Sequence, residues 1–480
     1  MPKQVVVVGA GQGGLSAAIH ARLLGHDVLV LERQDQIGGK AQAIETHGYS
    51  LDPGPSIIIL PRLYEAVFRH ANRKMEDYLH FQRLDPFTRV YFEGSEPFDL
   101  PDGEAGCLEV LRQVAPQDVG SIQKLLATLD RVSGLIDRTI FDRPFDKPWQ
   151  LAHPDLTRFA LSFDVRASFR ELVDRWFQSP VLRAFFYGFP SYSGQSYRAK
   201  SPSGLLIPYY MIREGVWYPL GGVRVIPQAF ARLAVELGVE FRTGAAVVGF
   251  ESRNGRIDAV RLQNGERIEC DAVISNQDRV TTRRMLGEKL SPPPSYSYFT
   301  VHWGIRRRLP GLSHHTLLVP RDYEKGFEAL YDHRVFPDPP IVYLNATHEV
   351  DPSVAPDGCS NLFAVVTCPA IEDHLDWNTE AAKGRDRVLA SLRSFGWELD
   401  PGEIDFERIQ TPLLFESRDG SYRGSLYGPD EKFRLWGGIL PLSVRDPEYP
   451  NLTYAGGSVQ PGSGLPMTTL SGKFAAEALR

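Results

Sequence analysis

Residues 4–32 read QVVVVGAGQGGLSAAIHARLLGHDVLVLE, and this stretch decides the fold. An apolar run at 4–8 is followed by a glycine cluster, a helical stretch at 15–24 that ends at Gly25, and a second apolar run at 28–31. That order predicts a strand, a turn, a helix and a strand. Because both apolar runs are continuous, the strands are expected to lie in a parallel sheet that is sandwiched by helices. The sequence therefore predicts an α/β protein.

Three glycines stand at the turn between that strand and that helix. Gly9 permits a tight turn, Gly11 lets the backbone approach a pyrophosphate, and Gly14 lets the helix pack closely on the sheet. The start of the helix offers free N–H groups and a positive potential to the anion. Glu32 ends the second strand, where a carboxylate can accept hydrogen bonds from the ribose hydroxyls of an adenosine. These residues predict a dinucleotide site that fits NAD or FAD.

Two further turns favour the longer cofactor. Gly38-Gly39-Lys40 carries a second glycine pair, whose missing side chains would let a long cofactor pass beyond the pyrophosphate. The turn Asp52-Pro-Gly54-Pro55 is rigid, since its two prolines and its glycine fix the direction of the backbone.

The segment 454–467 has the same character. Its glycines let the backbone approach a flat ring, and Pro466 suits the first turn of a closing helix at 467–479. The start of that helix would stabilise negative charge on a reduced flavin. FAD is therefore the expected cofactor.

Changes in composition predict the domain organisation. A discontinuous, Rossmann-like FAD-binding domain is expected from residues 1–75, 215–285 and 440–480. Residues 76–210 contain amphipathic stretches such as 120–140 and 164–186, which predict a mainly helical insertion suited to contact a membrane.

The remaining residues predict β structure. Two Asn-Gly turns separate expected strands at 246–253, 257–262 and 267–274. Strand-like runs at 296–304, 341–346 and 361–366 predict that 286–439, with parts of 76–214, form a β-sheet substrate-binding domain.

Charge and cysteine usage exclude several classes of protein. The net charge of −6 gives no concentrated positive field, so nucleic acid is not an expected partner. The four cysteines include no C-x-x-C pair, and neither a disulfide framework nor a metal site is expected. No stretch approaches 18 apolar residues without a charge, and no secretory signal is expected. The sequence therefore predicts a cytoplasmic protein whose contact with a membrane is peripheral.

Seven motifs together resemble those of the bacterial phytoene desaturase family. These carotenoid desaturases and their oxidase relatives belong to the flavin amine oxidase superfamily. The motifs are the glycine turn 9–14, Glu32-Arg33, Gly38-Gly39-Lys40, Asp52-Pro-Gly54-Pro55, and the segments 215–222, 271–276 and 456–466. The likeness covers nearly the whole chain and is least distinctive at 76–210.

The resemblance implies that FAD is bound with its adenine beside the backbone of Val247 and its flavin against the C-terminal loop. The implied cofactor-binding residues are Gly9, Gly11, Gly14, Glu32, Arg33, Gly38, Gly39, Lys40, Asp52, Gly54, Pro55, Val247, Asn276, Gly456, Gly457, Gly464, Leu465, Pro466 and Met467. Lys40 departs from the arginine usual in the family, and Gln460 stands where desaturases commonly have histidine. The loop that follows Gln460 looks more like that of later-acting desaturases and terminal-carbon oxidases.

The activity implied by the resemblance is FAD-dependent desaturation of a linear carotene, with hydride transfer to the flavin. The expected partners are an apolar polyene, quinone or oxygen as electron acceptor, and a membrane surface. Three alternatives stay open: a carotenoid terminal oxidase or ketolase, a flavin-dependent cis-trans isomerase, and a non-catalytic lipid-binding protein.

A hydrocarbon substrate requires a long apolar channel, because it offers no group to hydrogen-bond. The aromatic-rich stretches 185–192 and 208–211 are candidates for its lining, with core packing as the alternative. The stretch 57–68 is predicted to be either a core helix or a helix that docks on a bilayer. The candidates for an acid or base are His302, His314, His315, Glu416 and Asp419, and no catalytic residue is assigned among them.

Overall fold

The expected strand, helix and strand are present as β1 (Gln4–Val8), α1 (Gln12–Leu23) and β2 (Asp27–Leu31). The computed structural model describes residues 2–54, 56–144, 166–433 and 442–479, and positions 154, 157, 161, 163 and 164. Strands β1 and β2 are parallel neighbours in a five-stranded sheet of order β19-β13-β1-β2-β9. The other strands are β9 (Glu240–Arg242), β13 (Ala272–Ser275) and β19 (Leu452–Tyr454). All pairings in this sheet are parallel, as the continuous apolar runs predicted.

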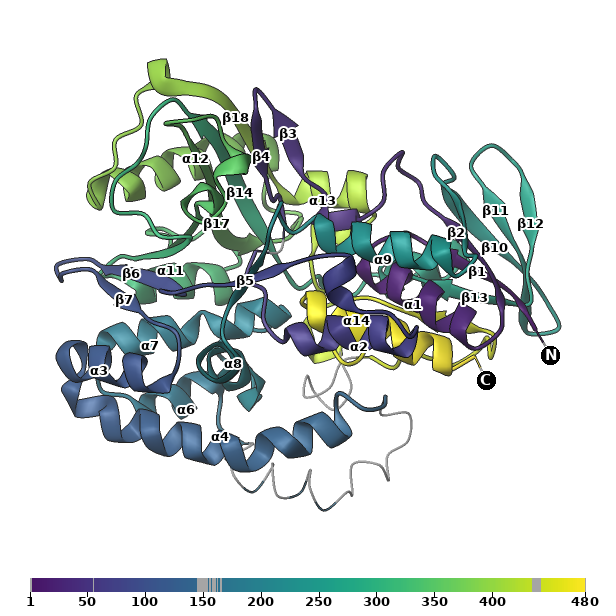
Figure 1. The fold of residues 1–480 in the computed structure, drawn as a ribbon, viewed down its shortest axis with the longest axis horizontal. Helices are drawn as coiled ribbons and strands as arrows, with labels where there is room; N and C mark the ends of the chain where they lie inside the picture. Colours follow the sequence, from purple (N-terminus) through teal and green to yellow (C-terminus); the bar gives the residue numbers. More distant parts are fainter. Residues whose placement is uncertain are drawn as a thin grey trace.

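Helices cover one face of this sheet. Val5 and Val7 share a core cluster with apolar residues of α1, of α9 (Val225–Glu236) and of α14 (Leu465–Glu477). In Figure 1 these helices lie together beside the sheet, with the yellow C-terminal helix next to the purple N-terminal one.

The expectation that helices cover both faces of this sheet is wrong for the opposite face. Val6 and Val8 belong to a different core cluster, which includes Ile257 and Val260 of a three-stranded antiparallel sheet. That sheet is formed by β10 (Val247–Arg253), β11 (Arg256–Leu262) and β12 (Arg267–Glu269). A continuous apolar run shows that both faces of a strand are buried, but it does not show what buries them.

The strand expected at 267–274 is two strands in two different sheets. β12 ends at Glu269 and β13 starts at Ala272, and the chain crosses from one sheet to the other between them. Asp271 fixes the crossing, because its N–H donates to the carbonyl of Gln4 and its carboxylate accepts from the N–H of Gln4 at 2.8 Å.

A second large sheet has seven strands in the order β18-β14-β17-β16-β15-β6-β7. One face of this sheet packs in a core cluster with α12 (Trp377–Ser394). The cluster contains Phe299, Val301 and Trp303 of β14. The strands are β6 (Thr88–Phe92), β7 (Phe98–Leu100), β14 (Tyr296–Ile305), β15 (His315–Val319), β16 (Val342–Asn345), β17 (Ser360–Pro369) and β18 (Ile404–Gln410). Figure 1 shows β14, β17 and β18 of this sheet apart from the parallel sheet, with α11 (Tyr323–Tyr331) below β14 and β17.

Helices dominate the described part of residues 104–214, whereas residues 81–100 of the predicted helical insertion 76–210 contain three strands, two of which belong to the seven-stranded sheet. The helices are α3 (Glu104–Val114), α4 (Val119–Thr139), α6 (Phe169–Trp176), α7 (Pro180–Tyr187) and α8 (Leu206–Glu214). The amphipathic stretch expected at 164–186 is broken into α6 and α7 at Pro180, which occupies the first position of the second helix, where proline is tolerated. The remaining elements are β3 (Ile44–Thr46), β4 (Tyr49–Leu51), α2 (Pro61–His70), β5 (Phe81–Arg83), β8 (Trp217–Pro219), α10 (Arg279–Met285) and α13 (Pro412–Asp419).

Helix α2 settles the two interpretations of the stretch 57–68. Leu63, Tyr64, Val67 and Phe68 are buried, and Phe68 packs edge-on against Phe230 of α9. Residues 61–68 of this stretch therefore belong to a core helix, and residues 57–60 precede it outside the helix. Within the described residues, no helix has both the length and the apolar character needed to cross a bilayer.

Candidate functional site

A cavity of about 640 Å³ has walls from the parallel sheet, the seven-stranded sheet and the helical region. One part of its wall is glycine-rich and polar, and the other part is apolar and aromatic. A cavity of this size is in the range that holds a small molecule or cofactor. We call these two parts the cofactor arm and the apolar arm. The cofactor arm is lined by residues 8–9, 11–13, 31–34, 38–41, 54, 247, 276–278, 418–419, 455–458 and 461–468, and the apolar arm by residues of α4, α7, α8, α11 and β14 to β17.

The glycine turn forms the floor of the cofactor arm. Gly9 has φ of +98°, and its N–H donates to the carbonyl of Leu31 at 2.8 Å. A Cβ on Gly14 would lie 2.1 Å from the carbonyl oxygen of Gly9, and a Cβ on Gly11 would lie 2.7 Å from Oδ1 of Asn276. Only glycine therefore lets the start of α1 come this close to the end of β1.

Glu32 anchors this turn from the end of β2. Its Oε2 accepts a hydrogen bond from the N–H of Ala10 at 2.7 Å, and its Oε1 accepts one from the N–H of Gln34 at 2.9 Å. The side chain is almost completely buried, yet Glu32 lines the cavity. The carboxylate thus has remaining acceptor capacity for a polar ligand in the cofactor arm.

The C-terminal loop is joined directly to the glycine turn. Nδ2 of Asn276 donates to the carbonyl of Ala455 at 2.9 Å, while Oδ1 of the same side chain lies against Gly11. Ser16 of α1 donates to the carbonyl of Thr469 in α14 at 2.7 Å. Two segments that are far apart in the sequence therefore form one wall, as the dinucleotide hypothesis required.

Several features of the cofactor arm fit FAD. Both α1 and α14 begin at the cavity, so two helix N-termini present N–H groups to it. Oε1 of Gln12 and Oε1 of Gln277 are buried and have no hydrogen-bond partner among the described residues, although both side chains line the cavity. A polar, elongated ligand would satisfy these groups, and an apolar one would not.

A group of half-buried charges lies in the same arm. Arg418 and Asp419 form a bidentate ion pair with both distances at 2.8 Å. Burial lowers the pKa of Lys40, although the nearby carboxylates of Asp419 and Asp278 oppose this. Burial also raises the pKa of Asp278. The positive charges of Lys40 and Arg418 are close enough to the cavity to meet an anionic group.

The implied cofactor-binding residues fall into three groups. Gly14 and Asp52 do not line the cavity, and Pro55 lies outside the described residues. Those that line it are Gly9, Gly11, Glu32, Arg33, Gly38, Gly39, Lys40, Gly54, Val247, Asn276, Gly456, Gly457, Gly464, Leu465, Pro466 and Met467.

Asp52 binds the backbone of a neighbouring turn and does not contact the cavity. Its Oδ1 accepts a hydrogen bond from the N–H of Val223 at 2.8 Å, next to the glycine pair at 221–222. Burial raises the pKa of Asp52 to about 7, and the neighbouring Asp351 adds to this. We therefore interpret Asp52 as a residue that positions the turn at 221–223.

The apolar arm is lined by part of the two aromatic stretches predicted for it. Phe185, Phe189, Tyr192, Tyr210 and Met211 line the cavity. The alternative of core packing holds for their neighbours Phe186, Tyr187, Pro208 and Tyr209, which do not line it.

Sequence reasoning missed the rest of the apolar arm. The missed residues lie on α4 (Ile136), on α11 (Phe327, Leu330, Tyr331) and on one face of the seven-stranded sheet (Tyr298, Thr300, Leu317, Tyr343, Phe363, Val365). No local signal could have identified the sheet residues, because β16 has only four residues and β17 carries a continuous apolar run at 362–366 without alternation.

The candidate acids and bases differ in whether they line the cavity. His302, His314 and His315 are buried and do not line the cavity. Burial lowers the pKa of His302 and of His314 to about 3, and lowers that of His315 well below its usual value. Glu416 is exposed, and Asp419 lines the cavity but is paired with Arg418.

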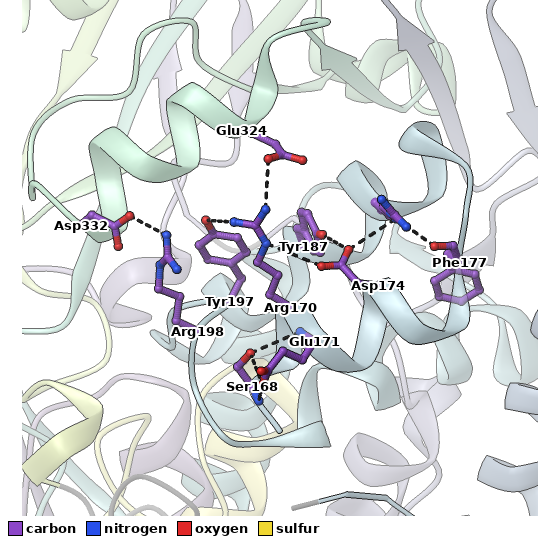
Figure 2. Close-up of polar contacts among 11 residues, drawn as sticks. Ser168, Arg170, Glu171, Asp174, Phe177, Tyr187, Tyr197, Arg198, Glu324 and Asp332 are labelled. Carbon is purple, nitrogen blue, oxygen red and sulfur yellow. Dashed lines mark hydrogen bonds and ion pairs between the residues drawn. The ribbon is translucent and has the colours of Figure 1, made fainter. Parts of the chain in front are cut away.

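Ion pairs hold the helix α11 against the helical region. Figure 2 shows Arg170 between Tyr197 and Glu324, with the guanidinium donating to Oε2 of Glu324 at 3.1 Å. Arg198 donates to Asp332 at 2.6 Å, immediately beyond the other end of α11. Because the inner side of α11 lines the cavity, these two pairs fix one wall of the apolar arm.

Known proteins share both the sequence and the fold of this chain. The profile of the family described as flavin containing amine oxidoreductase matches residues 13–293. The chain is 33% identical to the 4,4'-diapolycopene oxygenase of Methylomonas sp, over 99% of this chain and 98% of that protein. It is 34% identical to the zeta-carotene-forming phytoene desaturase of Myxococcus xanthus, over 99% of this chain and 94% of that protein.

A solved structure agrees with this assignment. The chain has the fold of an oxidoreductase from Methanosarcina mazei, with a TM-score of 0.67, 16% sequence identity and 98% of each chain covered. Sequence family, fold and the shape of the cofactor arm therefore point the same way. The chain belongs to the flavin-containing amine oxidoreductase family, in the group of carotenoid desaturases and carotenoid oxygenases, and it is an FAD-dependent oxidoreductase.

Proposed function

We propose that this protein is a carotenoid desaturase that introduces C=C bonds into a linear carotene. The observation that carries the proposal is the joining of the two arms in one cavity. A cofactor in the polar arm and a polyene in the apolar arm would meet without any solvent between them. Two of the full-length relatives are a phytoene desaturase and a diapolycopene oxygenase, which supports a carotenoid as substrate.

FAD would be held in the cofactor arm by the lining residues named above. The N–H groups at the start of α1 would bind the pyrophosphate, Glu32 would accept hydrogen bonds from the ribose, and the 456–467 loop would hold the flavin ring. When bound, the flavin supplies a two-electron acceptor that can take a hydride from carbon.

The apolar arm binds and orients the substrate. Burial of a hydrocarbon contributes about 0.8 kcal/mol for each CH₂-sized unit, so a long polyene can be held without any hydrogen bond. The aromatic side chains also exclude water from the reacting carbons. The substrate loses one hydride and, from the adjacent carbon, one proton that ends in solvent, and a quinone or oxygen takes up the two electrons.

Oxidation of the terminal carbon is the second candidate function. It is favoured by the diapolycopene oxygenase relative and by the hydroxyl groups of Ser56, Tyr298, Thr300 and Tyr343, which line the cavity and have no obvious use toward a pure hydrocarbon. We further propose a peripheral membrane location in the cytoplasm, since the substrate dissolves in a bilayer, and quinone or oxygen as electron acceptor.

The test is product analysis on purified protein loaded with FAD. It is incubated with a quinone and a panel of linear carotenes in liposomes, and products are identified by mass spectrometry. New double bonds support the first function and new oxygen supports the second. Isomerised product or unchanged bound polyene would contradict both.

A matched pair of variants connects that activity to the cavity. Ala184 lies on α7 in the apolar arm, so Ala184→Phe should block substrate while leaving FAD affinity unchanged. Val235 is 60% exposed on α9, so Val235→Phe introduces the same side chain outside the cavity and should keep activity. Equal activity in the two variants would contradict the proposed substrate site.

A further inference from the structure

A chain of hydrogen bonds runs from the sheet into the cavity. The hydroxyl of Tyr343 donates to Oγ of Ser56 at 2.9 Å, and Nδ1 of His315 lies 2.6 Å from the same tyrosine oxygen. Tyr343 and Ser56 line the cavity, whereas His315 is completely buried behind them. A ligand in the cavity can therefore reach Ser56, which ends this chain of hydrogen bonds, and Tyr343 beside it.

The register of the strands explains this placement. Tyr343 of β16 pairs with Leu317 of β15 and with Val365 of β17, and all three line the cavity. His315 lies two residues before Leu317, so its side chain is on the same face of the sheet. The polar chain is thus built into the wall of an otherwise apolar arm.

Ser56 also lies beside the cofactor arm. It comes two residues after Gly54, at which a Cβ would lie 2.2 Å from the carbonyl oxygen of Lys40. Gly39, next to Lys40, packs against Gly11 of the glycine turn. A group bound at Ser56 therefore lies where the two arms join, which is where a reacting carbon must be.

Each member of this chain of hydrogen bonds can act as a donor or as an acceptor. Neutral histidine carries its proton on either ring nitrogen, and both hydroxyls can rotate, so Ser56 can present a donor or an acceptor to the cavity. Nδ2 of Asn345 lies 3.4 Å from Nδ1 of His315, and Nε2 of His315 has no hydrogen-bond partner among the described residues. The NH₂ group of Asn345 can only donate, so it favours an accepting Nδ1, but this contact is long and the same group donates to the carbonyl of His314 at 3.0 Å. Both directions of the hydrogen-bonded chain therefore stay accessible.

A buried polar chain facing an apolar ligand is costly, because its free end loses the water it would otherwise bind. A hydrocarbon cannot compensate for this loss, but an oxygen atom on the ligand can. An alcohol can both donate and accept, and an aldehyde can only accept. A chain that reverses direction fits both.

We propose that Ser56, Tyr343 and His315 form a specificity site that binds a hydroxyl or aldehyde oxygen at the end of a linear polyene. This inference rests on the proposed function, because it assumes that the apolar arm holds a polyene. It assigns to the arm a ligand more oxidised than a carotene.

Binding without turnover tests the site. The full-length protein is loaded with FAD, which is kept reduced under anaerobic conditions, and is titrated with a linear polyene hydrocarbon and with its terminal alcohol of equal length. Dissociation constants are measured for the wild type, Tyr343→Phe and Ser56→Ala. Comparing two ligands across the same variants cancels differences in ligand hydrophobicity.

The expected result is selective. Tyr343→Phe and Ser56→Ala should each weaken binding of the alcohol about 5- to 10-fold and leave binding of the hydrocarbon within about twofold. Tyr91→Phe is the matched control, since its hydroxyl donates to the carbonyl of Gly311 at 2.8 Å and it belongs to the same sheet without lining the cavity. It should leave both affinities unchanged.

Three results would overturn the site. Equal weakening for both ligands, or no weakening for the alcohol, would show that the chain does not recognise oxygen. A parallel loss of FAD affinity or a shift in the flavin absorption spectrum of both variants would assign the chain to the cofactor instead. In each of these three results, the proposed function still holds if the wild type binds the hydrocarbon. A wild type that binds neither polyene would overturn both the specificity site and the proposed function.

Discussion

Oε2 of Glu32 accepts a hydrogen bond from the backbone N–H of Ala10 at 2.7 Å. The end of β2 thereby holds the glycine turn at the end of β1 in place. The carboxylate that is suited to bind ribose is also the group that shapes the turn for the pyrophosphate. One side chain thus connects two parts of the cofactor arm.

Replacing Glu32 by glutamine should weaken FAD binding. The amide keeps one acceptor oxygen but puts an NH₂ group against the N–H of Ala10 or Gln34, so one charge-assisted hydrogen bond becomes a clash of donors. A loss of about 1.5–3 kcal/mol corresponds to roughly 10- to 150-fold weaker binding. Titration of the apoprotein with FAD, followed by flavin fluorescence, measures it. Glu240→Gln, exposed on the neighbouring strand β9, should bind FAD normally, and equal affinities would refute the prediction.

Gly14→Ala should prevent the site from forming. Its Cβ would lie 2.1 Å from the carbonyl oxygen of Gly9, so α1 would have to move away from β1. Gly120→Ala is a control of the same kind, because Gly120 is also helical but a Cβ there would meet nothing within 4 Å. We expect Gly14→Ala to lower thermal stability and FAD binding, and Gly120→Ala to be neutral or to stabilise by about 1 kcal/mol. Similar melting temperatures for the two variants would contradict the collision.

Asp52 should make stability depend on pH. Its pKa is raised to about 7 in the folded protein, so its contribution is complete below its usual pKa near 4 and is lost as the pH rises through 7. Asp52→Asn cannot ionise and should gain stability relative to the wild type over that window, by at most about 4 kcal/mol. Urea unfolding between pH 5 and 8 measures the difference, with the exposed Asp357→Asn as control. Parallel profiles for the wild type and Asp52→Asn would show that Asp52 has an ordinary pKa.

The ion pairs around α11 should affect substrate more than cofactor. Arg198→Glu places two negative charges together at Asp332, and this should raise the KM for the polyene while FAD affinity stays unchanged. The pair is partly exposed, so the loss of stability should stay below about 1 kcal/mol and shrink at high salt. Adding Asp332→Arg restores an ion pair and should recover the KM. A double variant as impaired as the single one would mean that the ion pair does not hold the wall.

Much of the cofactor arm could be predicted because its signals are local. The valines of β1, the glycines after it and Glu32 at the end of β2 all lie in the one stretch 4–32, and the geometry of strand, turn and helix follows from them. Pro180 is a local signal for the break between α6 and α7. The amphipathic pattern continues across it and therefore predicts one helical stretch at 164–186.

The apolar arm could not be predicted in the same way. Whether Tyr343 faces the cavity depends on its pairing with Leu317 and Val365, which lie on other strands, and β16 itself is too short to show a clear alternation. The position of Asp52 depends on contact with Val223, which is equally remote in the sequence. Such contacts are properties of the assembled chain and have no local pattern.

The joining of α1 and α14 has a consequence for synthesis. The glycine turn leaves the ribosome early, but β19 and α14, which complete the sheet and close the wall, are made much later in translation. An incomplete nascent chain therefore lacks the C-terminal wall of its flavin pocket and exposes the apolar side of α1 that α14 would cover. We expect the yellow colour to develop only after translation, and chains cut before residue 452 to be substrates for chaperones and proteases.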